Sequence, residues 1–410
     1  MTFPPRQRAA ALTFATAALL SSTAGAHSFG VIYNLPVPFW LYAYGATAAL
    51  VLSFLVVAFF AVGTGPARAA AGPVLLRAPQ LAVLRRLQPL LQVGSVLLLL
   101  LCLATGFFGH RNPYQNFNMT FFWIVCVLGI AYLSALLGDL YRLLNPWRAL
   151  AEGIERVWPG FMRGRWQLPP AAGSWVALAF YMVFIWVELF ASIRPYSLAV
   201  LLAGYTLLNL VGVYCVGHRD WFARCEFFGL LFGLIARMAP LQRVGGELRW
   251  RLPFSGLLQG RAADFSVLLF ILFMLSSTAF DGLRATLPWM KLFWHDPLGL
   301  LTPQLGGPPL YFYAQLQPWY ERLEVASLLI SPLLYLAAYA LCMALAKALT
   351  RSPLTVRELM LRFAYSLLPI ALVYNVTHYY TLLLTQGVTI FSLVSDPFGW
   401  GWNLFGTARQ

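Results

Sequence analysis

Three ionisable residues, Glu188, Asp281 and His378, fall inside apolar stretches that are long enough to cross a membrane. Ionisable side chains are costly at membrane depth, and they persist where they face a cavity or a partner rather than lipid. Counted from the predicted cytoplasmic ends of their helices at 1.5 Å per residue, all three lie roughly 22–27 Å deep. This common depth predicts that the three side chains converge in the outer third of the membrane.

His378 belongs to the stretch Tyr374-Asn375-Val376-Thr377-His378-Tyr379-Tyr380. Spacings of four and three residues place Tyr374, Asn375 and His378 on one face of a helix. Two interpretations remain open: a hydrogen-bonded contact between two helices, or a site that opens to the outer side of the membrane. In the second, His378 is the candidate general base for a water molecule, with Glu188 or Asp281 orienting its ring.

Three further polar residues, Arg284, Asn375 and Gln386, are candidates for binding a substrate or an anion. Arg284 lies one helical turn beyond Asp281, so its guanidinium could form a salt bridge with that carboxylate or bind an anionic group. The sequence leaves both roles open.

The histidines also raise the possibility of a metal site. Four of the five are predicted on the outer side, His378 among them, and together with Glu188 and Asp281 they could bind a divalent ion. The candidate ligands from the outer segments are His27 and His110. The spacings His-x-x-x-His and His-Glu-x-x-His are absent, so the cofactor is a divalent metal ion or none.

The composition is typical of a helical membrane protein. Of the 410 residues, 60% are hydrophobic and 10% are charged, whereas soluble domains are about 25% charged. The net charge of +14 does not indicate a nucleic-acid partner, because the basic residues lie mainly in short loops between apolar runs. We therefore predict an all-α, polytopic fold whose partner is the lipid bilayer.

The apolar runs predict eight transmembrane helices in a single domain, residues 27–410, after a cleaved signal peptide, residues 1–26. The signal segment ends in Ala24-Gly25-Ala26, which fits the small-x-small cleavage rule. Twenty of the 28 lysines and arginines fall in loops that this topology places in the cytoplasm, as the positive-inside rule requires. Both mature termini are then periplasmic. The predicted spans are residues 39–62, 89–109, 118–138, 173–190, 197–217, 263–280, 325–349 and 363–387.

Two segments between the spans have predicted structures of their own. Residues 221–239 are apolar but are interrupted by Arg224, Glu226 and Arg237, which favours an interfacial or half-buried cytoplasmic helix over a span. The segment from 285 to 324 is the longest outer loop and is rich in tryptophan, so we expect it to lie at the interface and to roof the site. We interpret Asn145 and Glu226 as capping and anchoring residues at the cytoplasmic side.

Four longer motifs stand out along the chain. They are His27-Ser-Phe-Gly-Val-Ile-Tyr-Asn-Leu-Pro-Val-Pro-Phe-Trp-Leu-Tyr, Gly138-Asp139 with Asn145-Pro146-Trp147-Arg148, Phe280-Asp281-Gly282-Leu283-Arg284-x-Thr286, and Asp396-Pro397-Phe398-Gly399-x-Gly401-Trp402-x-x-Phe405-Gly406. These motifs resemble those of bacterial integral membrane proteins of the fenitrothion hydrolase family, and the resemblance covers essentially the whole mature chain. It implies hydrolysis of an organophosphorus triester at the bacterial inner membrane, with release of a nitrophenol. It does not assign catalytic residues.

The resemblance also implies a partner, because longer relatives continue past the Gly-Trp-x-x-Phe-Gly-Thr motif with at least one more span. A small membrane subunit could supply that span. The expected function is an organophosphate hydrolase acting on a small apolar substrate near the periplasmic face. The alternatives are a transporter or permease, whose polar residues would line a pathway, and a metal-handling assembly factor of the membrane.

Overall fold

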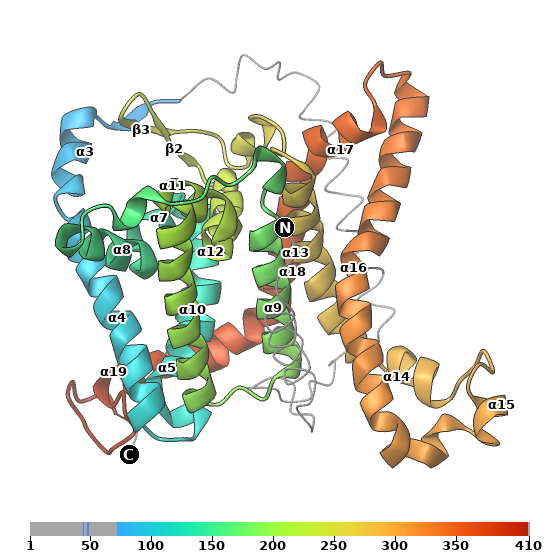
Figure 1. Cartoon of the computed structure of the whole chain (residues 1–410). Coiled ribbons are helices and arrows are strands. Elements are labelled where there is room, and N and C mark those ends of the chain that lie inside the picture. Colours follow the sequence, from blue (N-terminus) through green and yellow to red (C-terminus); the bar gives the residue numbers. More distant parts are fainter. Residues whose placement is uncertain (1–43, 45–46, 49–71, 409–410) are drawn as a thin grey trace.

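The computed structural model describes residues 44, 47, 48 and 72–408. Within them, seven helical segments are long and apolar enough to cross a membrane, which confirms the all-α, polytopic prediction (Figure 1). The predicted signal peptide lies outside the described residues, as does almost all of the span predicted at 39–62. The seven segments are Gln88–Phe108, Phe117–Leu137, Pro170–Phe190, Pro195–Val216, Phe265–Arg284, Pro309–Thr350 and Val356–Ser395.

Most predicted span boundaries lie within a few residues of the helices observed. The principal helices are α4 (Gln88–Phe108), α5 (Phe117–Thr120) continued by η3 (Phe121–Gly129) and α6 (Ile130–Leu137), α9 (Trp175–Phe190), α10 (Pro195–Val216), α13 (Phe265–Arg284), α16 (Tyr313–Thr350) and α18 (Leu368–Gln386). The shorter helices are α3 (Ala78–Arg85), α7 (Tyr141–Leu144), α8 (Pro146–Val157), α11 (His218–Asp220), α12 (Phe227–Ile235), α14 (Leu287–Trp294), α15 (Thr302–Leu305), α17 (Val356–Phe363) and α19 (Ile390–Ser395).

Helix α13 forms the centre of the helical bundle and packs against α9, α16 and α18. Its sequence from Val267 to Leu275 is apolar around the whole circumference, which is typical of a helix buried on all sides. Its N-terminus is capped by Asp264, whose Oδ1 accepts hydrogen bonds from the backbone N–H groups of Ser266 and Val267. Residues that α13 projects sideways therefore meet three other helices rather than lipid.

Helix α16 is longer than its predicted span, 325–349. It begins at Tyr313 and contains 38 residues, so it measures about 57 Å, well beyond the ~30 Å of a hydrocarbon core. The prediction of a loop up to residue 324 is wrong there, because the helix continues through Pro318. The part before Val325 extends toward α14 and α15, at the lower right of Figure 1.

The segment predicted as an interfacial or half-buried helix is a short, deeply buried one. Helix α12 has nine residues, or about 13 Å, so the prediction that it does not span is confirmed. Phe227, Phe228 and Phe232 are each less than 5% exposed, which corrects the interfacial placement. The helix is apolar on every side, so no polar face remains to meet headgroups.

A three-stranded antiparallel sheet, which we did not predict, lies near one end of the bundle. Its strands are β1 (Val74–Leu76), β2 (Leu241–Val244) and β3 (Glu247–Trp250), in the order β1-β3-β2. Gly245 and Gly246 join β2 to β3 with φ values of 59° and 85°, as a tight hairpin with the twist of its strands requires. This Gly-Gly pair was the sequence signal for the hairpin.

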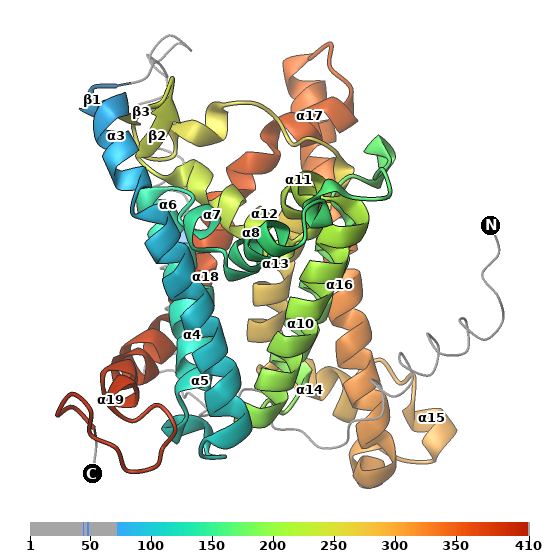
Figure 2. The ribbon, with the colours of Figure 1, turned by 60° about the vertical axis from the view of Figure 1, so that its left-hand side comes forward.

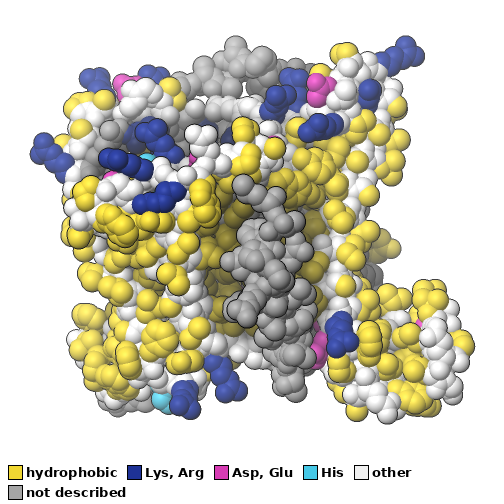
Figure 3. All heavy atoms as spheres, viewed as in Figure 1, with side chains coloured by type: hydrophobic (Ala, Val, Ile, Leu, Met, Phe, Trp, Pro, Cys, Tyr) yellow, Lys and Arg dark blue, Asp and Glu magenta, His cyan; other side chains and the backbone are white. Residues whose placement is uncertain are grey.

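The ends of the molecule differ in charge. Lysines and arginines gather at the end that holds the sheet, α8 and α17, while the middle is largely apolar (Figure 3). We call this end the basic end and the opposite end, with α14, α15 and α19, the aromatic end. The distribution is the one that the positive-inside rule describes.

Helices α4 and α10 pack closely, and Figure 2 shows them converging toward the aromatic end. Gly106 permits this approach, because a Cβ atom there would lie 2.5 Å from Cβ of Ala199 and 2.7 Å from the carbonyl oxygen of Pro195. Any larger side chain at Gly106 would push the two helices apart.

Two loops at the aromatic end repeat one design. The carboxylate of Asp296 accepts hydrogen bonds from the backbone N–H groups of residues 300, 301 and 302, at 2.7–2.8 Å. The carboxylate of Asp396 accepts from those of residues 400 and 401, at 3.0 and 2.7 Å. In each loop the glycine three residues on, Gly299 or Gly399, has a positive φ. The sequence Asp-Pro-x-Gly occurs at 296–299 and again at 396–399 because both segments form the same kind of turn.

Candidate functional site

His378 of α18 and Asp281 of α13 are in direct contact, with 2.7 Å between Nε2 and Oδ2. The Asp281 side chain is 4% exposed, whereas that of His378 is 27% exposed. An ionised carboxylate only accepts hydrogen bonds, so it holds the proton of a neutral imidazole on Nε2 and leaves the lone pair on Nδ1. The ring is thereby fixed with its basic nitrogen away from Asp281.

The next residue of α18 makes a second contact of the same kind. The hydroxyl of Tyr379 donates a hydrogen bond to Oε1 of Glu188 on α9, at 2.7 Å. Successive residues of a helix point about 100° apart, so α18 reaches α13 with His378 and α9 with Tyr379. The two rings meet edge to face, with centroids 4.8 Å apart. The three ionisable groups predicted to converge are thus brought together, and Tyr379 joins Glu188 to the other two.

Asn375 lies one turn before Tyr379 on the same helix. Its Oδ1 is 3.0 Å from the hydroxyl of Tyr132 on α6, which donates a hydrogen bond to it. The face predicted to hold Tyr374, Asn375 and His378 is divided between two neighbours: Tyr374 and His378 approach α13, with the Tyr374 hydroxyl close to Gly282, while Asn375 faces α6.

The carboxylates of Glu188 and Asp281 line one cavity of about 60 Å³, which is otherwise largely apolar. This volume admits a few water molecules, but not an aryl triester. A substrate of that size must therefore meet His378 on its exposed side. The polar residues of the lining are Tyr181, Glu188, Ser277, Thr278, Asp281, Asn375 and Tyr379.

The predicted roof of tryptophans is wrong for this cavity, since no tryptophan lines it and its aromatic residues are Tyr181, Phe184 and Tyr379. Trp289 instead lines a second cavity of about 240 Å³ between α13 and α16. The segment carrying Trp289 folds as α14 against the end of α13, and the ring of Trp289 packs edge to face on Phe280 of α13.

Arg284 forms its ion pair with Glu324 of α16, at 3.9 Å between Nη2 and Oε2. It also donates a hydrogen bond to the carbonyl oxygen of Leu189, at 3.0 Å, and its guanidinium lies 4.6 Å from the ring centroid of Phe190. The guanidinium therefore ties together the ends of α9, α13 and α16. The predicted salt bridge with Asp281 is wrong in its partner, because the guanidinium pairs with Glu324 instead.

The other predicted residues lie away from this centre or outside the described chain. Gln386 is half-buried at the end of α18, two turns beyond His378, and does not line the cavity. His110 is exposed, and its Nδ1 accepts a hydrogen bond from the backbone N–H of Asn112 at 3.1 Å. His27 is outside the described residues. Within the described ranges, no group of three or more His, Cys, Asp or Glu side chains is placed to hold a metal ion.

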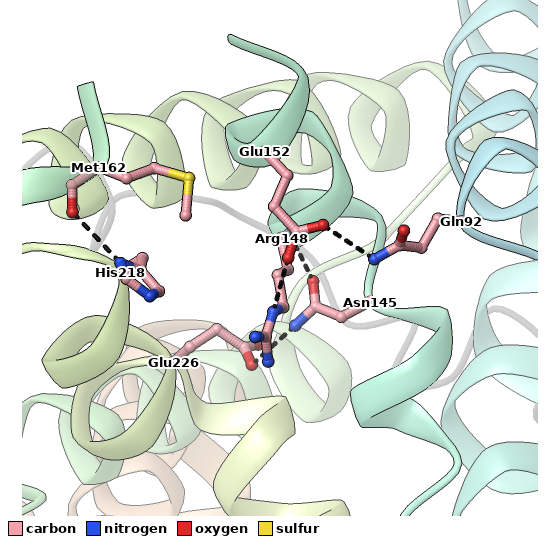
Figure 4. A network of polar contacts seen from close by, with 7 residues as sticks. All are labelled: Gln92, Asn145, Arg148, Glu152, Met162, His218 and Glu226. Carbon is pink, nitrogen blue, oxygen red and sulfur yellow. Dashed lines mark hydrogen bonds and ion pairs between the residues drawn. The ribbon is translucent and has the colours of Figure 1, made fainter. Parts of the chain in front are cut away.

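A separate polar network lies toward the basic end (Figure 4). Asn145 caps α8 by accepting a hydrogen bond from the backbone N–H of Arg148 at 3.0 Å. Arg148 is paired with Glu152, which also accepts a hydrogen bond from Gln92. His218, the first residue of α11, makes a separate contact, with its Nδ1 3.3 Å from the carbonyl oxygen of Met162. The predicted capping role of Asn145 is confirmed.

Glu226 is the most buried carboxylate of that network, with 1% exposure. It caps α12 through the backbone N–H groups of residues 228 and 229, and it accepts hydrogen bonds from the hydroxyls of Tyr141 and Tyr205 at 3.1 and 2.8 Å. Burial raises the pKa of Glu226 to about 7, against the opposing effect of these hydrogen bonds. The predicted capping role of Glu226 is confirmed, whereas its burial inside the domain contradicts anchoring at the interface.

Sequence reasoning missed Tyr132, Tyr379 and Ser277. The signal for Tyr379 was its spacing of four from Asn375, which places the two on one helix face. Tyr132 carried no such signal, because its hydrogen bond with Asn375 joins residues that are far apart in the chain. Ser277 carried none either, because only the packed structure places it in the cavity lining.

Comparison with known proteins gave no match to a family model, to a curated protein or to a solved structure.

Proposed function

We propose that this protein is a membrane hydrolase of apolar organophosphorus triesters such as fenitrothion, with His378 as the general base. The observation that carries the proposal is the 2.7 Å contact between a buried Asp281 and a partly exposed His378. A buried carboxylate that orients an accessible imidazole is the arrangement that general-base catalysis requires. The resemblance of the sequence motifs supplies the substrate class.

In the proposed reaction a water molecule attacks phosphorus while Nδ1 of His378 accepts its proton. The new bond joins the water oxygen to phosphorus, and the bond between phosphorus and the aryl oxygen breaks. The nitrophenolate leaves with the electron pair of that bond. The negative charge of Asp281 stabilises the imidazolium that forms.

The substrate reaches this centre from the membrane. Apolar triesters partition into lipid, and the exposed side of His378 lies beside Tyr374, one helical turn away on the same face of α18, which is 37% exposed. We place the protein in the bacterial inner membrane with its basic end in the cytoplasm, so that the site lies nearer the periplasmic face. A small membrane subunit would pack beside the domain.

The test is hydrolysis of an aryl dialkyl phosphorothioate by the purified full chain in lipid nanodiscs, alone and with any co-purifying small subunit. His378→Ala should lower kcat by about 10²- to 10⁴-fold, the usual contribution of a general base. His110→Ala, which removes an exposed histidine, is the matched control and should leave kcat unchanged. Equal rates for the two variants would remove His378 from the mechanism.

Treatment with a chelator addresses the metal question. Activity that disappears on chelation and returns with a divalent ion would assign the nucleophile to a metal-bound water. Activity that survives chelation supports the base mechanism.

A transporter is the second candidate, and the specific observation in its favour is the carboxylate-lined cavity among α6, α9, α13 and α18. Ionisable residues that line an interior cavity are common in transport pathways. Uptake of an organic phosphate ester into proteoliposomes, without hydrolysis and lost in Glu188→Gln, would favour transport over hydrolysis.

A further inference from the structure

Ser277 of α13 is the unexplained polar group of the cavity. Its side chain is 2% exposed, and it lines the cavity beside both carboxylates. Within the described part of the chain its Oγ makes no hydrogen bond of good geometry, although the hydroxyl of Tyr181, another lining residue, lies near it. A buried hydroxyl without a partner costs free energy, so such groups are normally satisfied by protein or by ordered water.

The cavity meets the physical conditions for ordered water. Its volume of about 60 Å³ exceeds the 10–15 Å³ that one water molecule needs, and a stable buried water needs two to four polar partners. Ser277 lies one helical turn before Asp281 on α13, and both face the cavity that Glu188 and Tyr379 also line. A hydroxyl and two carboxylates therefore surround one small space.

We propose that this cavity is a binding site for ordered water, which Ser277 fixes and which bridges the carboxylates of Asp281 and Glu188. Ser277 is then a positioning residue: the bridge holds Asp281 in the orientation that it needs to direct His378. The kinetic part of this inference rests on the proposed hydrolase function, whereas the water site itself does not.

The neighbouring serine provides a contrast. Ser276 faces α16, where its Oγ accepts a hydrogen bond from Ser331 at 2.9 Å, and it lines the second cavity. Two adjacent buried serines on one helix thus serve different neighbours: one is satisfied by another side chain, and the other faces the carboxylate-lined cavity.

The experiment compares Ser277→Thr with Ser277→Val in the full chain. The two side chains have the same shape and differ by one hydroxyl, so the comparison isolates the group that would bind water. Thermal unfolding should show a higher Tm for the threonine variant. With an aryl phosphorothioate, the valine variant should lose about 10- to 100-fold in kcat, the scale of a misplaced catalytic group, with KM unchanged. Threonine should restore kcat, and Ser276→Ala should leave it unchanged.

Each outcome bears on a separate claim. A Tm for the valine variant that equals or exceeds that of the threonine variant would overturn the water site, because a dry cavity favours the apolar side chain. A higher Tm for threonine with equal kcat values would overturn the positioning role alone. If the wild-type chain hydrolyses nothing, the proposed function fails, and the Tm comparison still decides the water site.

Discussion

His378 and Tyr379 are consecutive residues of α18, and each holds a carboxylate from a different helix: Asp281 of α13 and Glu188 of α9. One turn of one helix therefore fixes the positions of both acidic groups. This relationship makes the two contacts separable by mutation, because either can be removed without touching the other.

Removing the charge of Asp281 should affect rate more than binding. In Asp281→Asn the amide cannot stabilise an imidazolium, and its NH₂ group can turn toward Nε2, which shifts the ring proton to Nδ1. We expect kcat for triester hydrolysis to fall by about 10²-fold or more while KM changes little. Steady-state kinetics in nanodiscs measures this, and an unchanged kcat would show that Asp281 serves packing alone.

Tyr379→Phe should destabilise the fold by leaving Glu188 with one donor fewer. Hydrogen bonds to charged groups contribute about 1.5–3 kcal/mol, so a lower Tm is expected. Tyr380→Phe is the matched control, because Tyr380 is 56% exposed and its hydroxyl deletion should have little effect. Similar Tm values for the two variants would mean that the contact between Tyr379 and Glu188 contributes nothing to stability.

Glu226 should make stability depend on pH. Its folded pKa of about 7 lies above the ordinary value of 4.5, so the folded protein binds the proton more tightly than the unfolded chain. The free energy of unfolding should then be largest at pH 4.5 and below, and it should fall by about 3 kcal/mol as pH rises to 7 and above. Denaturation of wild type and Glu226→Gln across this range measures the difference, which should vanish if Glu226 titrates normally.

Gly106→Leu should separate α4 from α10. The added side chain would collide with Ala199 and with the backbone at Pro195, and overpacking of this kind costs about 1–3 kcal/mol or more. Gly94→Leu on the same helix is the control, because a Cβ there meets nothing within 4 Å. Thermal unfolding that ranks the two variants equally would contradict the close packing at Gly106.

Much of the fold could be predicted because hydrophobic length and charge distribution are local properties of the sequence. The position of a residue along its helix can also be counted from the sequence. This count placed Glu188, Asp281 and His378 at a similar depth, and in the structure His378 contacts Asp281 while Asp281 and Glu188 line one cavity. The rotation of each helix is set by its neighbours, so sequence spacing alone did not show that Asn375 faces α6 while His378 faces α13.

The failures also have physical causes. Spacing along α13 suggested Asp281 as the partner of Arg284, but Arg284 pairs with Glu324 of α16. Local spacing cannot show a pairing between two helices. The charged residues within 221–239 suggested a surface, but Glu226 is satisfied by tyrosine hydroxyls and backbone groups and is buried with α12. Burial of a charged residue depends on partners that are distant in sequence.

The loops that begin at Asp296 and Asp396, at the aromatic end, bear on which acidic residues are available for catalysis. Asp296 and Asp396 are acidic residues in aromatic-rich segments of the aromatic end, and by residue type each is a candidate acid. In each of them both carboxylate oxygens accept hydrogen bonds from backbone N–H groups four to five residues further along the chain. These two carboxylates therefore stabilise their own turns, and their oxygens are already engaged as hydrogen-bond acceptors.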